Sequence, residues 1–295
     1  MGHFHPGERI VQQRMGQDHI AERVGRMIRA DIPEVAASFL AEQPMVVIAA
    51  ADDAGRMWAG ELVGPPGFVH ALDRETIAVD ARPVPGDPLR DALAHRARIG
   101  MIALQPQRRR RMRINGTATP LGGGLRIATD QVYSNCPKYI SRRQIESYRP
   151  DIGPSAPDRG TELDARQQEA IAAADTFFLA TADLDGNADA SHRGGNPGFL
   201  QVLSPTRLRW PDYRGNSMFM TLGNIEVNPR CGILVPDWVT GGSLQLAGTA
   251  QLVWDQATFA TGAQCSIDFT ITDVVEIRTA GPLRWGSAEL SPVNP

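Results

Sequence analysis

Long apolar runs are missing from this 295-residue sequence, and no stretch approaches the roughly 20 apolar residues that a membrane-spanning helix requires. The segment that begins at Met1 also lacks an apolar signal core. We therefore expect a cytoplasmic protein that has no membrane partner.

Cysteine and net charge are also low. The three cysteines, Cys136, Cys231 and Cys265, are far apart and odd in number, which argues against a disulfide framework and a four-thiolate zinc site. His3 and His5 lack a third ligand, so no metal site is predicted. The formal net charge of −3 gives no electrostatic basis for nucleic-acid binding, which a strongly basic domain would favour.

Three widespread motifs are missing too. The sequence has no GxGxxG after a strand, no GxxxxGKS/T and no GxSxG, which argues against dinucleotide-fold, P-loop and hydrolase proteins. What remains is the composition of a globular protein, with 42% hydrophobic and 21% charged residues. Its length suits two domains of ordinary size.

What the sequence does contain is a long internal repeat. Gly55 meets Gly186 at a separation of 131 residues, and at this separation ten of 24 consecutive positions are identical, including Pro-Gly-Phe at 66–68. With one extra residue in the second copy, Gly-Thr-Ala at 116–118 meets the same residues at 248–250. A period this long indicates a duplicated domain, because solenoid repeats run to roughly 20–50 residues.

The chain is therefore expected to divide into four segments. Proline, glycine and aspartate replace apolar periodicity in a linker over 149–160. A helical extension over 1–30 precedes a first half over 31–148, and the second half covers 161–295. Each half has the pattern of an α+β domain that is rich in antiparallel strands.

Local signals predict several elements. An incomplete apolar stripe predicts helical structure over 8–30, and Pro33 marks a helix start in the first half. In the second half, Thr161 is expected to cap a helix that runs to about Asp175, and a strand follows over 176–182.

The most informative stretch of the second half is a turn between a strand and a helix. The turn Tyr213-Arg-Gly-Asn216 is expected to open a helix, with Asn216 or Ser217 as its N-cap. The free N–H groups of a helix N-terminus, with Arg214 beside them, would hold a phosphate. An ordinary tight turn with a solvated arginine explains the same residues equally well.

Two further stretches carry unusual residues. In Ser191-His-Arg-Gly194, glycine interrupts a strand pattern, which marks a bulge or a close approach by backbone or by a flat ligand. The run Arg108–Arg111, followed by Arg113, favours a solvated turn, with a phosphate-rich ligand as the alternative.

The order of these motifs, with Asn228-Pro-Arg230 after them, resembles the pyridoxamine 5′-phosphate oxidase-related flavoproteins. Residues 132–140 resemble the segment that closes a barrel in this family. The resemblance implies a mainly β, α+β fold of two FMN-binding split β-barrels in tandem, forming an internal pseudo-dimer. It also implies FMN between the halves, in contact with Ser191, His192, Arg193, Gly194, Asp212, Tyr213, Arg214, Gly215, Asn216 and Ser217 of the second half and with Asn135 and Lys138 of the first.

The function implied by the resemblance is a flavin-dependent oxidoreductase that acts on a small molecule. Neither the substrate nor the catalytic residues are assigned by the sequence, and homodimerisation is left open. A non-catalytic flavin-binding protein and a protein with haem or a deazaflavin in the same cleft are the alternatives.

The first half departs from the family pattern. Glu61 stands where the second half has His192, and the loop over 81–88 replaces the phosphate turn with prolines and Asp87. An acidic side chain disfavours a phosphate, and proline removes N–H donors. The sequence therefore predicts one FMN per chain.

Overall fold

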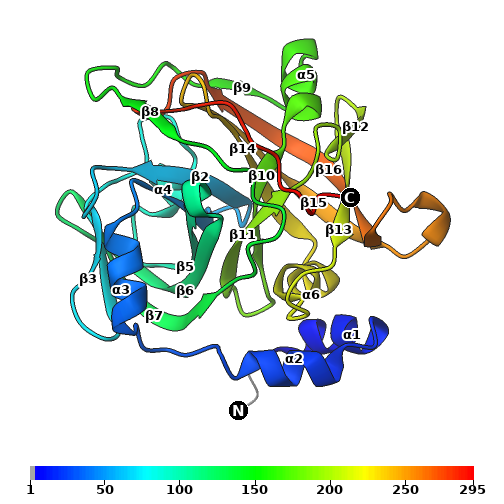
Figure 1. Ribbon diagram of the computed structural model, residues 1–295. Coiled ribbons are helices and arrows are strands. Elements are labelled where there is room, and N and C mark those ends of the chain that lie inside the picture. The colour runs from blue at the N-terminus through cyan, green and yellow to red at the C-terminus, as the bar shows by residue number, and fades with distance from the viewer. Residues whose placement is uncertain (1–3) are drawn as a thin grey trace.

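The computed structural model describes residues 4–295, and its regular structure is mostly antiparallel strands (Figure 1). Residues 1–3, which open the predicted N-terminal extension and include His3, lie outside the described residues. No helix among the described residues is long and apolar enough to cross a membrane.

The sheet of the first half has seven strands in the order β2-β1-β5-β6-β7-β4-β3. They are β1 (Met45–Ala51), β2 (Met57–Val63), β3 (Val69–Ala71), β4 (Thr76–Val79), β5 (Ala97–Gln105), β6 (Arg110–Leu121) and β7 (Gly124–Ser134). A short helix, α4 (Leu89–Ala92), lies between β4 and β5 in the chain.

The second half repeats this strand order as β11-β10-β14-β15-β16-β13-β12, so each strand of the first sheet has a counterpart numbered nine higher. Its strands are β10 (Thr176–Ala182), β11 (Ala188–Gly194), β12 (Gln201–Ser204), β13 (Arg207–Tyr213), β14 (Arg230–Asp237), β15 (Gly242–Val253) and β16 (Ala263–Ile277). The predicted strand over 176–182 is confirmed as β10. Even the irregularities match, because the β6–β7 register shifts at Asn115/Gly116 and the β15–β16 register shifts at Ala247/Gly248.

Three short strands tie the remaining segments to these sheets. β8 (Ile145–Tyr148) pairs with β17 (Leu283–Trp285), which joins the end of the first half to the C-terminal segment. β9 (Asp158–Gly160) lies within the predicted linker over 149–160 and pairs with β16. The C-terminal end of the linker is thus attached to the second sheet.

The halves pack against each other through aligned positions. Gly100 of β5 lies against the backbone of Asp189 and Ala190 in β11, and Gly232 of β14 lies against the backbone of Met57 and Trp58 in β2. Neither glycine has space for a Cβ atom, so any larger residue would push the sheets apart. The separation of 132 between Gly100 and Gly232 equals that of the later part of the sequence repeat.

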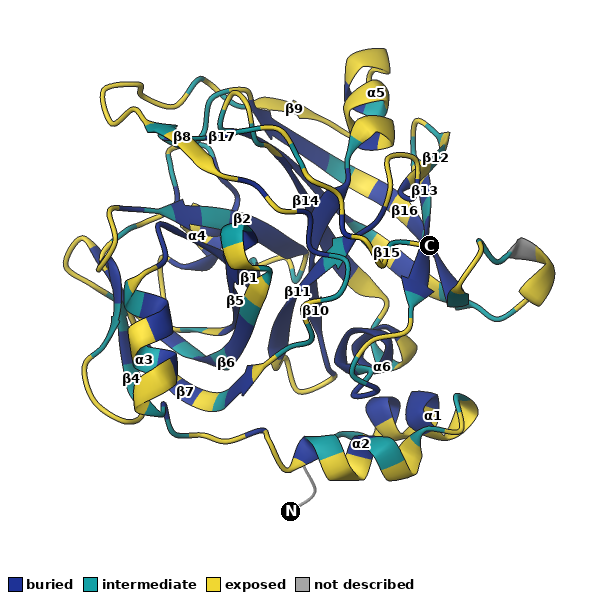
Figure 2. Ribbon diagram, viewed as in Figure 1, coloured by how far each residue is buried: buried dark blue, intermediate teal, exposed yellow. Residues whose placement is uncertain are grey.

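The buried residues gather within each half and between the two sheets (Figure 2). Each half has its own apolar core, the first around Trp58 and the second around Trp210. A third cluster lies between the sheets and combines alanines of both halves with larger apolar residues such as Phe178 and Leu234. Burial of this apolar surface is the main force that holds the halves together.

Helices precede each sheet in the chain, and two of their predicted boundaries are wrong. α3 (Glu34–Ala41) begins after Pro33 as predicted. α5 (Ala165–Ala173) is capped by Asp164, which accepts a hydrogen bond from the Gln167 N–H, and not by Thr161. The predicted helical stretch over 8–30 is two short helices, α1 (Pro6–Arg14) and α2 (Asp18–Gly25), because Gly16 between them has a left-handed φ of 62°.

Candidate functional site

A cavity of about 70 Å³ lies between the two halves, at the turn that follows β13. The first half contributes Arg111 and Arg113 of β6 with residues 135–136, and the second contributes Arg193 of β11 with residues 212–213 and 215–222. The cavity has room for a few water molecules or one phosphate group and is too small for an isoalloxazine ring. A flavin bound through its phosphate would therefore extend outside this cavity.

Three guanidinium groups meet here with only two carboxylate partners. Arg113 Nη1 lies 3.0 Å from Asp189 Oδ2, and Arg193 Nη2 lies 3.2 Å from Asp212 Oδ1. No carboxylate pairs with Arg111 among the described residues. Its Nη1 lies 2.7 Å from His192 Nδ1 instead. The cluster thus carries an excess positive charge in a partly enclosed place, which favours an anion.

The ionisation of these groups is shifted by burial. Burial, together with the charges of Arg113 and Arg193, lowers the pKa of Arg111 to about 9. Burial and the neighbouring arginines, Arg111 first among them, lower the pKa of His192 well below its usual value, so His192 is neutral at pH 7. Because its Nδ1 faces the Arg111 donor, its proton belongs on Nε2.

Several buried polar atoms of the cluster have no hydrogen-bond partner among the described residues. They are the Nε atoms of Arg111, Arg113 and Arg193, the Oδ1 atom of Asn135 and the Nε2 atom of His192. Buried polar groups without partners are costly and are normally satisfied by water, an ion or a ligand. The donors outnumber the acceptor, so this donor set fits an oxygen-rich anion such as a phosphate.

Residues 191–194 of β11 contribute to this site unequally. Ser191 is buried, and its hydroxyl lies 2.8 Å from that of Thr221. Gly194 lies against the carbonyl oxygen of Tyr139, so backbone contact accounts for the glycine there. Of the four, only Arg193 lines the cavity.

The turn after β13 differs from its prediction. Asn216 Oδ1 accepts a hydrogen bond from the Met218 N–H, and the helix α6 (Met220–Val227) begins only after Phe219. The predicted N-cap at Asn216 or Ser217 is therefore wrong. Ser217 and Phe219 have left-handed φ values of 64° and 58°, which form a tight turn before the helix. Asp212, Tyr213, Gly215, Asn216 and Ser217 line the cavity.

Arg214 and Lys138 stand outside this group. Arg214 is exposed and does not line the cavity, so its predicted contact with a phosphate stays a prediction. Lys138 is half-buried and does not line it either, whereas Asn135 does. The segment that follows β7 still reaches the turn, because the Tyr139 hydroxyl donates to the Arg214 carbonyl at 3.0 Å and its ring lies 5.3 Å from that of Tyr213.

The sequence favours a solvated turn for Arg111 and Arg113, and this interpretation is wrong for both. Arg108, Arg109 and Arg110 belong to the turn and the start of β6, whereas the next two arginines of the series face the other half. The alternative of an anionic ligand fits these two positions. The sequence did contain a signal for the shared orientation of Arg111 and Arg113. Side chains alternate along a strand, so residues two positions apart lie on the same face.

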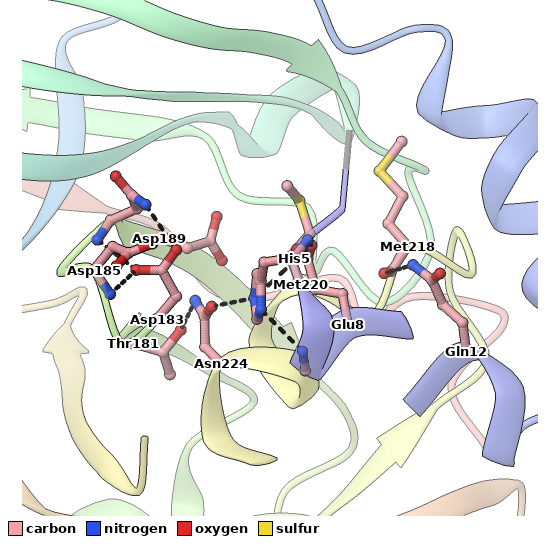
Figure 3. A network of polar contacts seen from close by, with 12 residues as sticks. His5, Glu8, Gln12, Thr181, Asp183, Asp185, Asp189, Met218, Met220 and Asn224 are labelled. Atoms are coloured by element: carbon pink, nitrogen blue, oxygen red, sulfur yellow. Dashed lines mark hydrogen bonds and ion pairs between the residues drawn. The ribbon is translucent and has the colours of Figure 1, made fainter. Parts of the chain in front are cut away.

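The N-terminal segment contacts the turn and α6, and Figure 3 shows Gln12 beside Met218 and His5 beside Asn224. Gln12 of α1 donates to the Met218 carbonyl at 2.9 Å, and the Ser217 hydroxyl donates to Gln17 Oε1 at 2.6 Å. His5 caps α1 and lies 2.9 Å from Asn224 of α6. Sequence reasoning did not connect this extension to the site, since the contacts span about 200 positions in the chain.

The aligned position in the first half has the opposite character. Leu89 and Asp87 fill the space beside Gly60, and Gln245 donates to Asp87 Oδ1 at 3.0 Å. Burial, and then the charges of Asp87 and Asp237, raise the pKa of Glu61 to about 8. Burial raises the pKa of Asp87 to about 6. An acidic, filled position of this kind disfavours a phosphate.

Replacement of Glu61 by glutamine is expected to stabilise the protein at pH 9 by about 1–2 kcal/mol and to change little at pH 4.5. The folded state holds the Glu61 proton to about pH 8, whereas the unfolded state releases it near 4.5. The wild type therefore loses stability as the pH rises through this window, and Glu61→Gln removes that loss. Urea unfolding at both pH values measures the free energy of unfolding of the wild type and of Glu61→Gln. Exposed Glu162→Gln is the control. An equal effect of Glu61→Gln at both pH values would contradict the interpretation.

These features define a mainly β protein with two open sheets of equal strand order and a cationic cavity between its halves. Residues 163–277, in the second half, match the family model described as Pyridoxamine 5′-phosphate oxidase. The predicted resemblance to pyridoxamine 5′-phosphate oxidase-related proteins is therefore confirmed. No curated protein matches the chain.

Several solved structures are similar to about two fifths of the chain. HupZ from Group A Streptococcus is 12% identical over 41% of this chain and 98% of its own, with a TM-score of 0.33. An FMN-binding protein from Syntrophomonas wolfei is 10% identical over 38% and 84%, with a TM-score of 0.28. A FAD-binding protein from Mesorhizobium loti is 15% identical over 42% and 99%, also with a TM-score of 0.28.

Proposed function

We propose that this protein is a flavin-dependent oxidoreductase that binds FMN between its halves and acts on a small molecule. The observation that carries the proposal is Arg111, a half-buried cation without a carboxylate partner among the described residues. It lies beside the turn that the family resemblance marks as a phosphate site. Arg111, Arg113 and Arg193 would hold the phosphate, with the turn at 215–217 beside it. Bound there, FMN would supply two-electron redox chemistry.

The chain's own groups would bind and orient such a cofactor. Asp189 and Asp212 hold Arg113 and Arg193 in place, so these two guanidinium groups need no reorganisation to receive an anion. His192 presents an N–H at Nε2 and stays neutral, because burial and then the adjacent arginines oppose its protonation. No side chain is assigned a proton transfer with substrate.

We further propose that the halves arose by tandem duplication and form an internal pseudo-dimer in which one of two equivalent sites was kept. The shared strand order, the aligned register shifts and the reciprocal packing of Gly100 and Gly232 support this. The site that was kept has Arg193 and Asp212, whereas the aligned residues of the other are Leu62 and Ala81.

Titration of the apo-protein with FMN is expected to give one tight site per chain. The cationic cavity has Arg193 and Asp212, whereas the aligned position of the first half is filled by Leu89 and Asp87. Calorimetry gives the stoichiometry, and the visible spectrum of the freshly purified protein distinguishes flavin from haem or deazaflavin. Reduction of the bound flavin by NADH or NADPH then tests the oxidoreductase activity. Two equivalent tight sites would rule out the asymmetric arrangement, and a haem spectrum would rule out the flavin.

A further inference from the structure

A second, wider cleft of about 570 Å³ adjoins the proposed flavin site in the first half. It lies between α3, the chain before it, the start of β6 and the end of β7. Arg111 and Asn135 line both this cleft and the cavity between the halves. A molecule in the cleft would therefore lie next to whatever occupies the cavity.

The charged residues of this cleft are all of one sign. Five arginines line it and no aspartate or glutamate does, among the described residues; they are Arg29, Arg108, Arg109, Arg110 and Arg111. Arg29 is neutralised by Asp31 at 2.7 Å and Arg109 by Glu289 at 3.0 Å. The carboxylate that pairs with Arg108 is distant, since Glu42 lies 4.0 Å away.

Arg110 and Arg111 have no carboxylate partner at all among the described residues. The Arg110 guanidinium lies over the Phe39 ring, 4.9 Å from its centroid, a stacked position that leaves its N–H groups free to donate at the edge. Two or three uncompensated positive charges thus face one cleft. Such a field attracts an anion.

The walls of the cleft are apolar in spite of this charge. Met27 and Val35 are 50% and 68% exposed, which is high for large apolar side chains, and both line the cleft together with Pro137. Apolar walls around a cationic centre match a ligand with an apolar body and an anionic group.

The aligned cleft in the second half has a different balance. It measures about 520 Å³ and is lined by Arg143, Arg166 and Arg278 together with Asp175, Asp237 and Glu276. Two of its arginines are paired, Arg143 with Asp175 at 2.9 Å and Arg166 with Glu276. The cleft beside the proposed flavin site therefore has an excess of positive charge that the aligned cleft of the second half lacks.

We propose that the cleft of Arg110 and Val35 binds an organic anion with an apolar body, and that this molecule is the substrate that meets the flavin. The cleft's ligand class rests on its own charge and walls, whereas the substrate role rests on the proposed function. The anionic group would contact Arg108 and Arg110, and the apolar body would lie along Met27 and Val35.

Two fluorescent probes with the same aromatic rings test the ligand class. 1-Anilinonaphthalene-8-sulfonate carries a sulfonate, and N-phenyl-1-naphthylamine does not. The sulfonate is expected to bind the full-length protein at one site, at least about tenfold more tightly than the neutral amine. Equal binding of the two probes would overturn the proposal.

Matched substitutions locate the site. Arg110→Gln and Val35→Asp are each expected to weaken sulfonate binding about tenfold or more, because one removes a charge and the other adds an opposing one. The controls are exposed Arg98→Gln and Val239→Asp, at the 74% exposed valine of the aligned cleft in the second half, and neither should change sulfonate binding. If the controls weaken binding as much as the test variants, the probe binds elsewhere and the proposal is wrong.

Saturation with FMN separates this inference from the proposed function. The sulfonate should still bind the FMN-loaded protein, and displacement by FMN would show that the cleft is part of the flavin site, which overturns the inference. If the protein binds the sulfonate in this cleft but does not bind FMN in calorimetry, the proposed ligand class stands and the proposed function is wrong.

Discussion

Arg111→Gln is expected to weaken FMN binding about ten- to a hundredfold and to leave the protein at least as stable as the wild type. Arg111 is a half-buried cation whose Nη1 contacts the neutral His192, and desolvation already lowers its pKa to about 9. Its charge is costly in the free protein and becomes favourable only when an anion is present. The substitution therefore separates binding from folding.

Calorimetric titration with FMN and urea unfolding of the apo-protein measure the two effects together. Arg108→Gln is the matched control, because it belongs to the same arginine run but does not line the cavity, and FMN affinity should be unchanged. A loss of stability in Arg111→Gln without loss of FMN affinity would assign this arginine a structural role.

Asp189→Ala is expected to destabilise the protein by about 3–5 kcal/mol. Asp189 of the second half pairs with Arg113 of the first, and their side chains are only 3% and 9% exposed. Removal of the carboxylate leaves Arg113 buried and unpaired near Arg111 and Arg193. The halves would then be held together by apolar contacts and other polar pairs against an uncompensated positive charge.

Removal of both charges tests this explanation. Asp189→Leu combined with Arg113→Met is expected to recover most of the stability, since a buried ion pair often contributes little more than apolar residues of similar volume. The exposed pair of Arg98 and Asp130 offers the control, and Asp130→Ala should cost less than about 1 kcal/mol. Urea unfolding gives each value. A double variant as unstable as Asp189→Ala would mean that packing and not charge explains the loss.

Much of the scaffold could be predicted from local and repeated patterns. The repeat that pairs Gly55 with Gly186 indicated two similar halves, and both sheets have the same strand order. The strand over 176–182 and the helix after Pro33 were predictable because apolar runs and proline act within a few residues. Helix boundaries were less predictable, since Asp164 competes with Thr161 as a cap and only the hydrogen bond to Gln167 decides.

The candidate site was only partly predictable. Arg193, Asp212 and the turn at 215–217 were found through the family resemblance, and all of them line the cavity. Arg111 and Arg113 were assigned to a solvated turn because a run of arginines normally faces water. Their true environment depends on β11 of the other half, whose Asp189 and His192 are 76 and 81 positions away in the chain.

The sequence by itself determined that this protein has two similar β-rich halves and that only the second carries the family's turn, because repeats, apolar periodicity and motif residues are local properties. The tertiary structure decided which arginines meet, that Arg111 lacks a carboxylate partner among the described residues, and that α1 and α2 support the turn through Gln12 and Gln17. Charge pairing and burial depend on distances across the interface between the halves, and those distances arise only when the two sheets pack.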